Sequence, residues 1–257
     1  MTYKNFNSNY WDNIAVSMSS HFRDQTIAYY HRYEYINLLK KWGGNIRIKN
    51  ILVTDLFNDA FRQDEFLSWL SKVNKKVIGI DISGVIVTRA RQYNPNLKYY
   101  IVCDVRRLPF KIHFFDLIIS PSTLDHFSRK DLCKSLIELN SILSRDGTLI
   151  VTLHNKHNLF LYFILMKYFK SVPFPIECYS IKEIKELLIS NGFRIADSAS
   201  IVHLLFPRTF LIILTRLKKN KVIYNFVREH IIFLSKMGRL VTKYFTGKFI
   251  AVKAHKV

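Results

Sequence analysis

Cysteine, glycine and acidic residues are all scarce in this chain, and the shortage of cysteine already excludes some kinds of protein. There are 3 cysteines and 8 glycines among 257 residues. Cys103, Cys133 and Cys178 are widely separated and form no C-x-x-C pair. This spacing argues against a structural zinc site and against a disulfide framework, and it favours a reducing, cytoplasmic compartment.

Long hydrophobic segments are lacking as well. The very apolar stretch 159–169 is too short to span a bilayer, which needs about 20 residues. The first seven residues lack the apolar region of a secretory signal, so no signal peptide is predicted. No Walker loop, H-E-x-x-H pair or Ser-His-Asp nucleophile elbow occurs, and no metal site is predicted.

Acidic residues are outnumbered, with 19 Asp and Glu against 39 Lys and Arg, which gives a net charge of +20. The excess is uneven, because from Pro207 onward 12 lysines and arginines stand against a single acid, Glu229. One interpretation is a composition bias that makes every surface basic. The other is a docking surface for something anionic, either a membrane face or a nucleic acid.

What the chain does have is a repeated pairing of apolar runs with acids in residues 48–155. The runs are ILV at 51–53, VIGI at 77–80, YYIV at 99–102 and LII at 117–119. Asp55, Asp81 and Asp104 come at or just past the ends of the first three, and Ser120 follows the fourth. Ligands of a parallel open sheet bind outside the carboxyl ends of its strands. The acids therefore predict a site for a nucleoside-type cofactor, whose hydroxyl and amino groups they could hold.

Helical patterns between these runs predict an α/β fold. Leu132, Leu136 and Leu139 recur at helical spacing after the fourth run, and 148–153 follows as a fifth strand. Strands that alternate with helices imply a doubly wound, mostly parallel sheet with right-handed crossovers. A helix at 180–191 and a last strand at 248–254 complete the pattern.

The chain is expected to divide into two parts. Residues 1–45 are predicted to form an N-terminal helical segment, either a lid over the strand ends or a cover for the sheet. Residues 46–257 would form the main domain, with its core at 48–155, 180–203 and 246–257. A helical, basic and amphipathic insertion at 206–245 would precede the last strand, which is expected to be antiparallel.

Four segments together resemble the class I S-adenosylmethionine-dependent methyltransferases, which share a Rossmann-like fold. They are VIGIDIS at 77–83, CDVRRLPF at 103–110, FDLIIS at 115–120 and LSRDGTLIV at 143–151. The chain is most similar to the group that includes the quinone-biosynthesis C-methyltransferases. The helix at 180–191, with Gly192 and Phe193, also fits that family's final crossover.

The resemblance implies S-adenosyl-L-methionine as the cofactor and a role for each matched residue. Asp81 would take both ribose hydroxyls, and Ile82 would lie against the adenine face. Asp104 would accept from the adenine amino group, while the backbone N–H of Val105 serves a ring nitrogen. Ser120 would line the path to the methionine part and the methyl acceptor. For Asp81, a plain helix N-cap is the alternative.

The first motif departs from the family, whose loop after the first strand is rich in glycine. Here it reads VTDLFNDAF at 53–61, with no glycine. Asp55 still matches the acid of the motif, Phe57 replaces the first glycine, and Asn58 or Asp59 could reach the ammonium of the ligand. A chain that no longer holds the cofactor, a non-catalytic membrane-associated relative, is therefore an alternative.

Direct methyl transfer needs a base only if the acceptor must lose a proton. The predicted pair is Asp125 and His126, just beyond the fourth strand, with Asp125 setting the tautomer of His126. The alternative is that Asp125 starts a turn and His126 packs under the next helix. His154 and His157, after the fifth strand, are weaker candidates.

The substrate class has to come from the last third of the chain. Between residues 221 and 245, apolar residues recur near i, i+3 and i+4, while Lys236, Arg239 and Lys243 fall mostly off that stripe. Such a helix is typical of a membrane surface or a partner-binding face, or it packs on its own domain. We expect a small hydrophobic or lipid-linked acceptor, reached from the cytoplasm at an anionic membrane surface. An RNA methyltransferase is the alternative that the charge keeps open, and the sequence identifies neither the acceptor nor the oligomeric state.

Overall fold

The computed structural model describes residues 7–18, 25–45, 49–61, 66–158, 176–203, 229, 233, 236, 239–240 and 242–257. Most of the basic insertion at 206–245, and the apolar stretch at 159–169, lie outside the described residues. Within the described part, no helix has the length and hydropathy that crossing a membrane requires.

Seven strands form one sheet in the order β3-β2-β1-β4-β5-β7-β6. They are β1 Ile51–Val53, β2 Val77–Asp81, β3 Tyr99–Val102, β4 Phe115–Pro121, β5 Leu143–His154, β6 Phe193–His203 and β7 Gly247–Lys256. The pairs among β3, β2, β1, β4 and β5 are parallel. β7 is antiparallel to both of its neighbours, β5 and β6. The predicted Rossmann-like, mostly parallel α/β sheet with an antiparallel last strand is confirmed.

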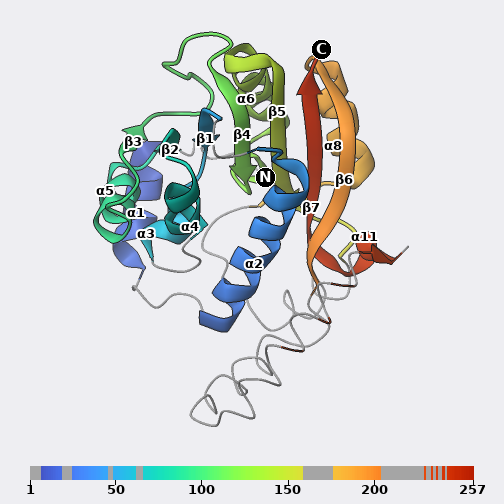
Figure 1. Ribbon diagram of the computed structural model, residues 1–257, viewed down its shortest axis with the longest axis horizontal. Helices are drawn as coiled ribbons and strands as arrows, with labels where there is room; N and C mark the ends of the chain where they lie inside the picture. The colour runs from blue at the N-terminus through green and yellow to red at the C-terminus, as the bar shows by residue number, and fades with distance from the viewer. Residues whose placement is uncertain are drawn as a thin grey trace.

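Helices cover both faces of the sheet because its central strands are apolar on both sides. α2 Gln25–Trp42, α4 Phe66–Val73 and α5 Gly84–Tyr93 pack on one face. α6 Arg129–Ile142 and α8 Ile181–Ser190 pack on the other, as Figure 1 shows. Successive residues of β1 divide accordingly, with Ile51 and Val53 in the first core and Leu52 in the second. The period-two alternation of a strand produces this division.

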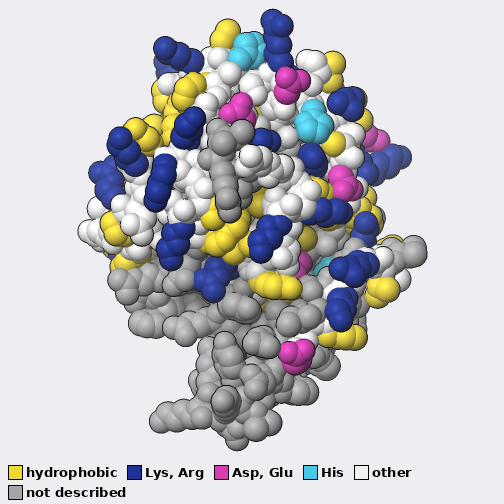
Figure 2. All heavy atoms as spheres, viewed as in Figure 1, with side chains coloured by type: hydrophobic (Ala, Val, Ile, Leu, Met, Phe, Trp, Pro, Cys, Tyr) yellow, Lys and Arg dark blue, Asp and Glu magenta, His cyan; other side chains and the backbone are white. Residues whose placement is uncertain are grey.

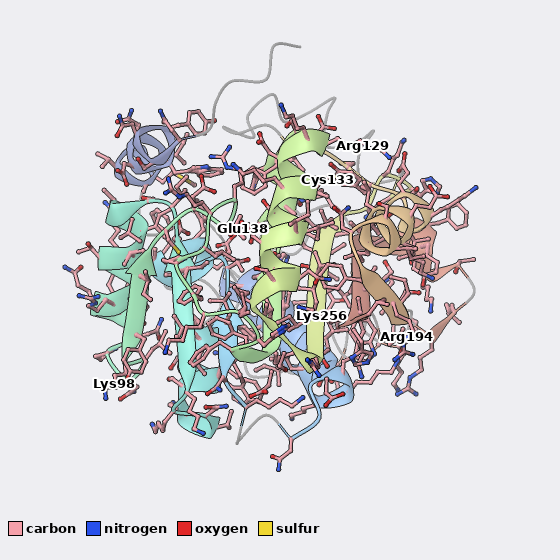
Figure 3. All side chains as sticks on the ribbon, turned by 90° about the horizontal axis from the view of Figure 1, so that it is seen from above. Lys98, Arg129, Cys133, Glu138, Arg194 and Lys256 are labelled. Atoms are coloured by element: carbon pink, nitrogen blue, oxygen red, sulfur yellow. The ribbon has the colours of Figure 1, made fainter. Side chains whose placement is uncertain are left out.

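On the second face, α6 is fixed to the end of the last strand. Figure 3 shows Arg129, Cys133 and Glu138 spaced along α6, with Lys256 near the other end of the helix. The ammonium of Lys256 donates to the carbonyl of Asn140 at 2.6 Å. α6 is the helix that the spacing of Leu132, Leu136 and Leu139 predicts, and α8 lies within one residue of the predicted 180–191.

The N-terminal segment divides into two helices with different surroundings. α2 crosses the sheet face in Figure 1, and the indole N–H of Trp42 donates to Asp197 at 2.8 Å. The hydroxyls of Tyr35 and Thr152 share a hydrogen bond of 2.7 Å. α1 Ser8–Ser17 instead packs against α5, where Arg89 donates to the carbonyl of Ala15. α2 thus covers the sheet, and the lid role of residues 1–45 stays a prediction that concerns α1.

The last three strands, β5, β6 and β7, are longer than the apolar runs in the sequence suggest. β5 begins at Leu143 rather than Thr148, and β6 and β7 pair with each other over most of their lengths. The sequence patterns also gave no sign of α3 Phe57–Ala60, a single helical turn inside the loop that lacks glycine. The short α11 Lys243–Thr246 lies immediately before β7.

Candidate cofactor and acceptor site

The predicted site residues come together at one edge of the sheet. β1, β2, β3 and β4 run parallel in adjacent positions, so their carboxyl ends meet there. Asp55 and Asp104 follow β1 and β3, Asp81 ends β2, and Ser120 is the next-to-last residue of β4. α1, α3 and the 3-10 turn η1 Leu124–His126 supply further side chains at this edge.

Asp81 ends β2, and its carboxylate is held by two backbone groups. One oxygen accepts from the N–H of Ser83 at 2.9 Å, and the other from the N–H of Leu56 at 3.2 Å. The N-cap of α5 is Ser83, whose hydroxyl accepts from the N–H of Ile86. Asp81 is therefore not the helix cap. Each of its oxygens keeps acceptor capacity, because a carboxylate oxygen has two lone pairs.

A second acid stands beside Asp81. Asp12 of α1 accepts from the hydroxyl of Ser83 at 2.5 Å and from the N–H of Val85 at 3.1 Å. Burial raises the pKa of Asp81 to about 6, and the neighbouring charge of Asp12 adds to the rise, while the backbone hydrogen bonds oppose it. Burial and a like charge destabilise the ionised carboxylate. A ligand that donates hydrogen bonds to it would stabilise the ionised form.

The loop without glycine folds back as α3. The Asp55 carboxylate accepts from the N–H of Phe57 at 2.7 Å. Asp59 is buried and accepts from the N–H of Leu67 and the side-chain amide of Asn94, both at 3.2 Å. The carboxylate of Asp59 therefore links α3 to α4 and to the end of α5.

Asn58 is the polar residue of α3 with spare capacity. Its side-chain oxygen is buried and has no hydrogen-bond partner among the described residues. Such an atom costs free energy unless something donates to it. It lies in the loop from which the methionine part of the cofactor was predicted to be held.

The segment after β3 contains an ion pair that the sequence patterns did not predict. Arg106 donates to both oxygens of Asp104, with a shortest contact of 2.7 Å. Its guanidinium also lies over the ring of Phe127 and 3.6 Å from Asp131. Ile82 is half-buried, and Val105, the residue between Asp104 and Arg106, is buried. Asp104 keeps a role in adenine binding as a prediction, with Arg106 as a competing partner.

Small hydroxyl side chains surround the end of β4. The hydroxyl of Thr54 donates to buried Ser120 at 3.0 Å and shares a hydrogen bond of 2.8 Å with Thr123. Ser122 has a φ of 51°, which is unusual outside glycine, and its buried hydroxyl has no partner among the described residues. Strain of this kind gathers at functional sites.

Asp125 has a different histidine partner from the one that the sequence suggested. Its side chain is fully buried, and one oxygen lies 2.5 Å from Nδ1 of His154 at the end of β5. The same oxygen accepts from the backbone N–H of His154 at 3.1 Å. Nε2 of His126 is 3.8 Å from the other oxygen, beyond hydrogen-bonding distance.

His126 instead contacts an aromatic group from α1. The ring of Trp11 lies edge-on to His126 at 4.9 Å and to Phe57 at 6.4 Å. α1 thus bridges the loop after β1 and the turn after β4. A place in the site was not predicted for Trp11 and Asp12, because an aromatic residue followed by an acid in a short helix forms no recognisable motif.

Comparison with known proteins gives one family match. Residues 62–151 match the family model described as a methyltransferase domain. The central part of the chain is therefore similar to a methyltransferase domain. S-adenosylmethionine, the cofactor that the sequence resemblance predicts, is bound in one solved structure of similar fold, and SAH in another. The comparison with curated proteins gives no match.

Solved structures share the fold of this chain over most of its length. The methyltransferase component of a Haloferax volcanii complex with the Trm112 activator has a TM-score of 0.64 at 18% identity, covering 97% of this chain and 96% of its own. Magnesium protoporphyrin IX methyltransferase from Synechocystis, with bound SAH, has a TM-score of 0.59 at 16% identity over 96% and 93%. A SAM-dependent methyltransferase from Thermotoga maritima has a TM-score of 0.57 at 18% identity over 89% and 92%.

The residues at the sheet edge fit this cofactor. Asp81 presents acceptors where a ribose has two hydroxyl donors, and the unpartnered oxygen of Asn58 suits an ammonium group. The loop without glycine is an ordered turn, since Leu56, its N-cap, hydrogen-bonds to Asp81. The loop without glycine is therefore connected directly to Asp81, the acid that the sequence predicts for ribose binding.

Proposed function

We propose that this chain is an S-adenosylmethionine-dependent methyltransferase acting on a small hydrophobic or lipid-linked acceptor. The observation that carries the proposal is Asp81, an acid at the end of β2 held open by two backbone N–H groups and neighboured by Asp12. This carboxylate could accept from a ligand with two adjacent hydroxyl groups, bound outside the carboxyl ends of the parallel strands.

In this proposal the sheet edge divides the cofactor among its strands. Asp81 accepts from the ribose hydroxyls, and Ile82 lies against the adenine. Asp104 and the N–H of Val105 bind the adenine edge. These contacts place the adenosine over β2 and β3.

The loop after β1 then receives the methionine part. Asn58 accepts from the ammonium, Phe57 narrows the space beside it, and Asp55 holds the turn that positions both. Asp59, engaged by Leu67 and Asn94, would act by fixing α3 rather than by direct contact. Ser120 lines the path toward the acceptor.

When bound, the cofactor supplies an electrophilic methyl group, and the chain has to bring the acceptor in line with it. His126 and Asp125 stand beyond β4, where the acceptor would approach. Trp11, against His126 and Phe57, would shield this position from water. The hydrophobic character of the acceptor rests on the apolar and basic sequence at 206–245.

Binding of S-adenosylhomocysteine to the full chain tests the proposal by calorimetry. Asp81→Ala should raise Kd at least tenfold, because it removes two hydrogen bonds to a charged group, each about 1.5–3 kcal/mol. Asp146→Ala is the matched control, since Asp146 is exposed in β5, which adjoins neither β1 nor β2. Equal affinity of wild type and Asp81→Ala would contradict the assignment.

A further inference from the structure

Asp125 and His154 form a couple that the proposed cofactor site does not use. Asp125 is fully buried, and it meets His154 at 2.5 Å through Nδ1. A carboxylate oxygen accepts, so the proton between them belongs to Nδ1 of the neutral ring. The lone pair of the imidazole is then on Nε2, the nitrogen that faces away from Asp125.

Nε2 of His154 is the open end of this couple. Among the described residues no hydrogen bond engages it, and 20% of the side chain is exposed. The ring is held in place by Phe249 of β7, edge-on at 4.6 Å. The ring of His31 in α2 lies edge-on to the same phenylalanine, at 5.5 Å. An oriented, unengaged nitrogen is therefore presented at the carboxyl end of β5, next to the turn after β4.

The charged surroundings suit a proton acceptor at neutral pH. Asp125 and His126 face His154 from η1, and Lys248 faces it from β7. Glu177 and Cys178 lie near Asp125 from the segment before α8. Burial lowers the pKa of His154, the strongest of these influences, while Asp125 opposes the shift. The ring is therefore neutral at pH 7, and its conjugate acid would have a buried anion as a direct partner.

We propose that His154, oriented by Asp125, is the base that takes the proton from the methyl acceptor. The inference rests on the proposed methyltransferase function. As the acceptor atom forms its bond to the methyl group, its proton passes to Nε2 of His154. The bond between methyl and sulfonium breaks, and its electron pair stays on sulfur. His154 ends as an imidazolium paired with Asp125. The imidazolium then releases the proton from Nε2 to water.

This role defines the acceptor more narrowly than the fold does. A base is useful only when the nucleophile carries a proton at neutral pH, as a phenol, an enol or an acidic C–H does. A thiolate or a tertiary amine would need none. The structure thus favours a protic oxygen or carbon acceptor. Asp125 acts through His154 and is a positioning residue.

Nuclear magnetic resonance of the chain labelled with ¹⁵N-histidine tests the arrangement without an acceptor. The His154 signal, identified by its loss in His154→Gln, should show a neutral ring with the proton on Nδ1 at pH 7. Its titration midpoint should lie below 6.5. A charged ring, or a proton on Nε2, at pH 7 would overturn the inference.

Methyl transfer provides the catalytic test. The full chain is incubated with S-adenosylmethionine labelled in its methyl group and a chloroform–methanol extract of cells that contain this protein. The organic and aqueous phases are then separated, and the label in each is counted. His154→Gln should lower transfer by about 100-fold or more, while binding of S-adenosylhomocysteine is unchanged. His255→Gln, at the far end of β7, is the matched control. Label in the organic phase would identify a lipid-linked acceptor, and label in the aqueous phase a water-soluble one.

The remaining variants separate His154 from its neighbours. Asp125→Asn should keep part of the activity and move the rising limb of the pH–rate profile to lower pH, because the imidazolium loses its anionic partner. Transfer that survives His154→Gln but is lost in His126→Gln would overturn the inference in favour of His126. Absence of transfer by wild type that binds S-adenosylhomocysteine would also overturn it. Failure to bind S-adenosylhomocysteine would instead defeat the proposed function.

Discussion

At the scale of single residues, the site is governed by two acids that share a small space. Asp12 and Asp81 both bind around Ser83, one through its hydroxyl and one through its N–H. Burial raises the pKa of Asp81, and the neighbouring charge of Asp12 adds to the rise. The folded state therefore holds a proton at Asp81 up to about pH 6, where an unfolded aspartate has already lost it.

This raised pKa gives cofactor binding a pH dependence. Because ribose hydroxyls donate best to an ionised acid, the affinity for S-adenosylhomocysteine should fall as the pH drops through about 6. Asp12→Asn keeps an oxygen that can accept from Ser83 but removes the charge, so the midpoint should move to lower pH. Calorimetry between pH 5 and 8 measures both. An unchanged midpoint would show that Asp12 does not influence Asp81.

Asn58 gives a second prediction at this scale. Its buried oxygen has no partner in the described part of the chain, so Asn58→Ala removes no hydrogen bond of the free protein seen there. Thermal stability should stay within about 1 kcal/mol of wild type or rise, while affinity for S-adenosylhomocysteine falls at least fivefold, or about 1 kcal/mol. A loss of stability without loss of affinity would assign Asn58 to the fold alone.

At the scale of elements, the start of α8 shows how local chemistry fixes a helix. Ser180 accepts from the N–H of Glu183 at 3.2 Å, and the Glu183 carboxylate accepts from the N–H of Ser180 at 2.7 Å. This reciprocal capping box satisfies two backbone donors at the helix start. The bond from Ser180, with that from Lys156, lowers the pKa of Glu183 to about 2.

Ser180→Ala should therefore destabilise the chain by about 1 kcal/mol. Ser190→Ala, in the exposed last turn of the same helix, is the control and should cost less. Since the folded pKa of Glu183 is depressed, its contribution is present above the unfolded value and is lost as the pH falls from about 4.5 toward 2. Urea unfolding of both variants measures the difference, and equal costs would contradict the capping argument.

The elements were largely predictable from sequence, and the contacts between them were not. β2, α5 and α6 follow from apolar runs and helical spacing, which depend on neighbouring residues only. Asp125 and His154 are 29 positions apart, one in the turn after β4 and the other at the end of β5, and a hydrogen bond joins them. Nothing in either local pattern distinguishes His154 from His126. The place of Asp12 beside Asp81 was hidden for the same reason, since it depends on the packing of α1 on α5.

At the scale of the whole molecule, positive charge dominates the surface. Lys and Arg side chains are spread over the face drawn in Figure 2, with few acids among them. The net charge of +20 supports attraction to an anionic surface of either kind, membrane or RNA. The predicted contact with a membrane surface depends on Lys236, Arg239 and Lys243, near the end of the basic insertion.

Binding to a membrane and binding to RNA differ in how they depend on salt and on these three residues. Replacing Lys236, Arg239 and Lys243 with glutamine should weaken binding to phosphatidylserine vesicles about 100-fold, because each charge near the surface is worth about 1 kcal/mol. Replacing exposed Lys75, Lys111 and Lys134 is the control with equal charge. Sedimentation with charged and neutral vesicles measures the effect. Tight, steeply salt-dependent binding to structured RNA, without vesicle binding, would favour the RNA alternative.

The position of β7 has a consequence for biosynthesis. β7 follows every other described strand along the chain, yet it lies between β5 and β6 in the sheet. While a nascent chain leaves the ribosome, β5 and β6 both emerge with an open edge and no native partner between them. An unpaired edge invites pairing with whatever strand is nearest, including a premature contact of β5 with β6. β5 can pair with β4 earlier, but its other edge and the whole of β6 find their native partner only after residues 247–256 have been synthesised and inserted.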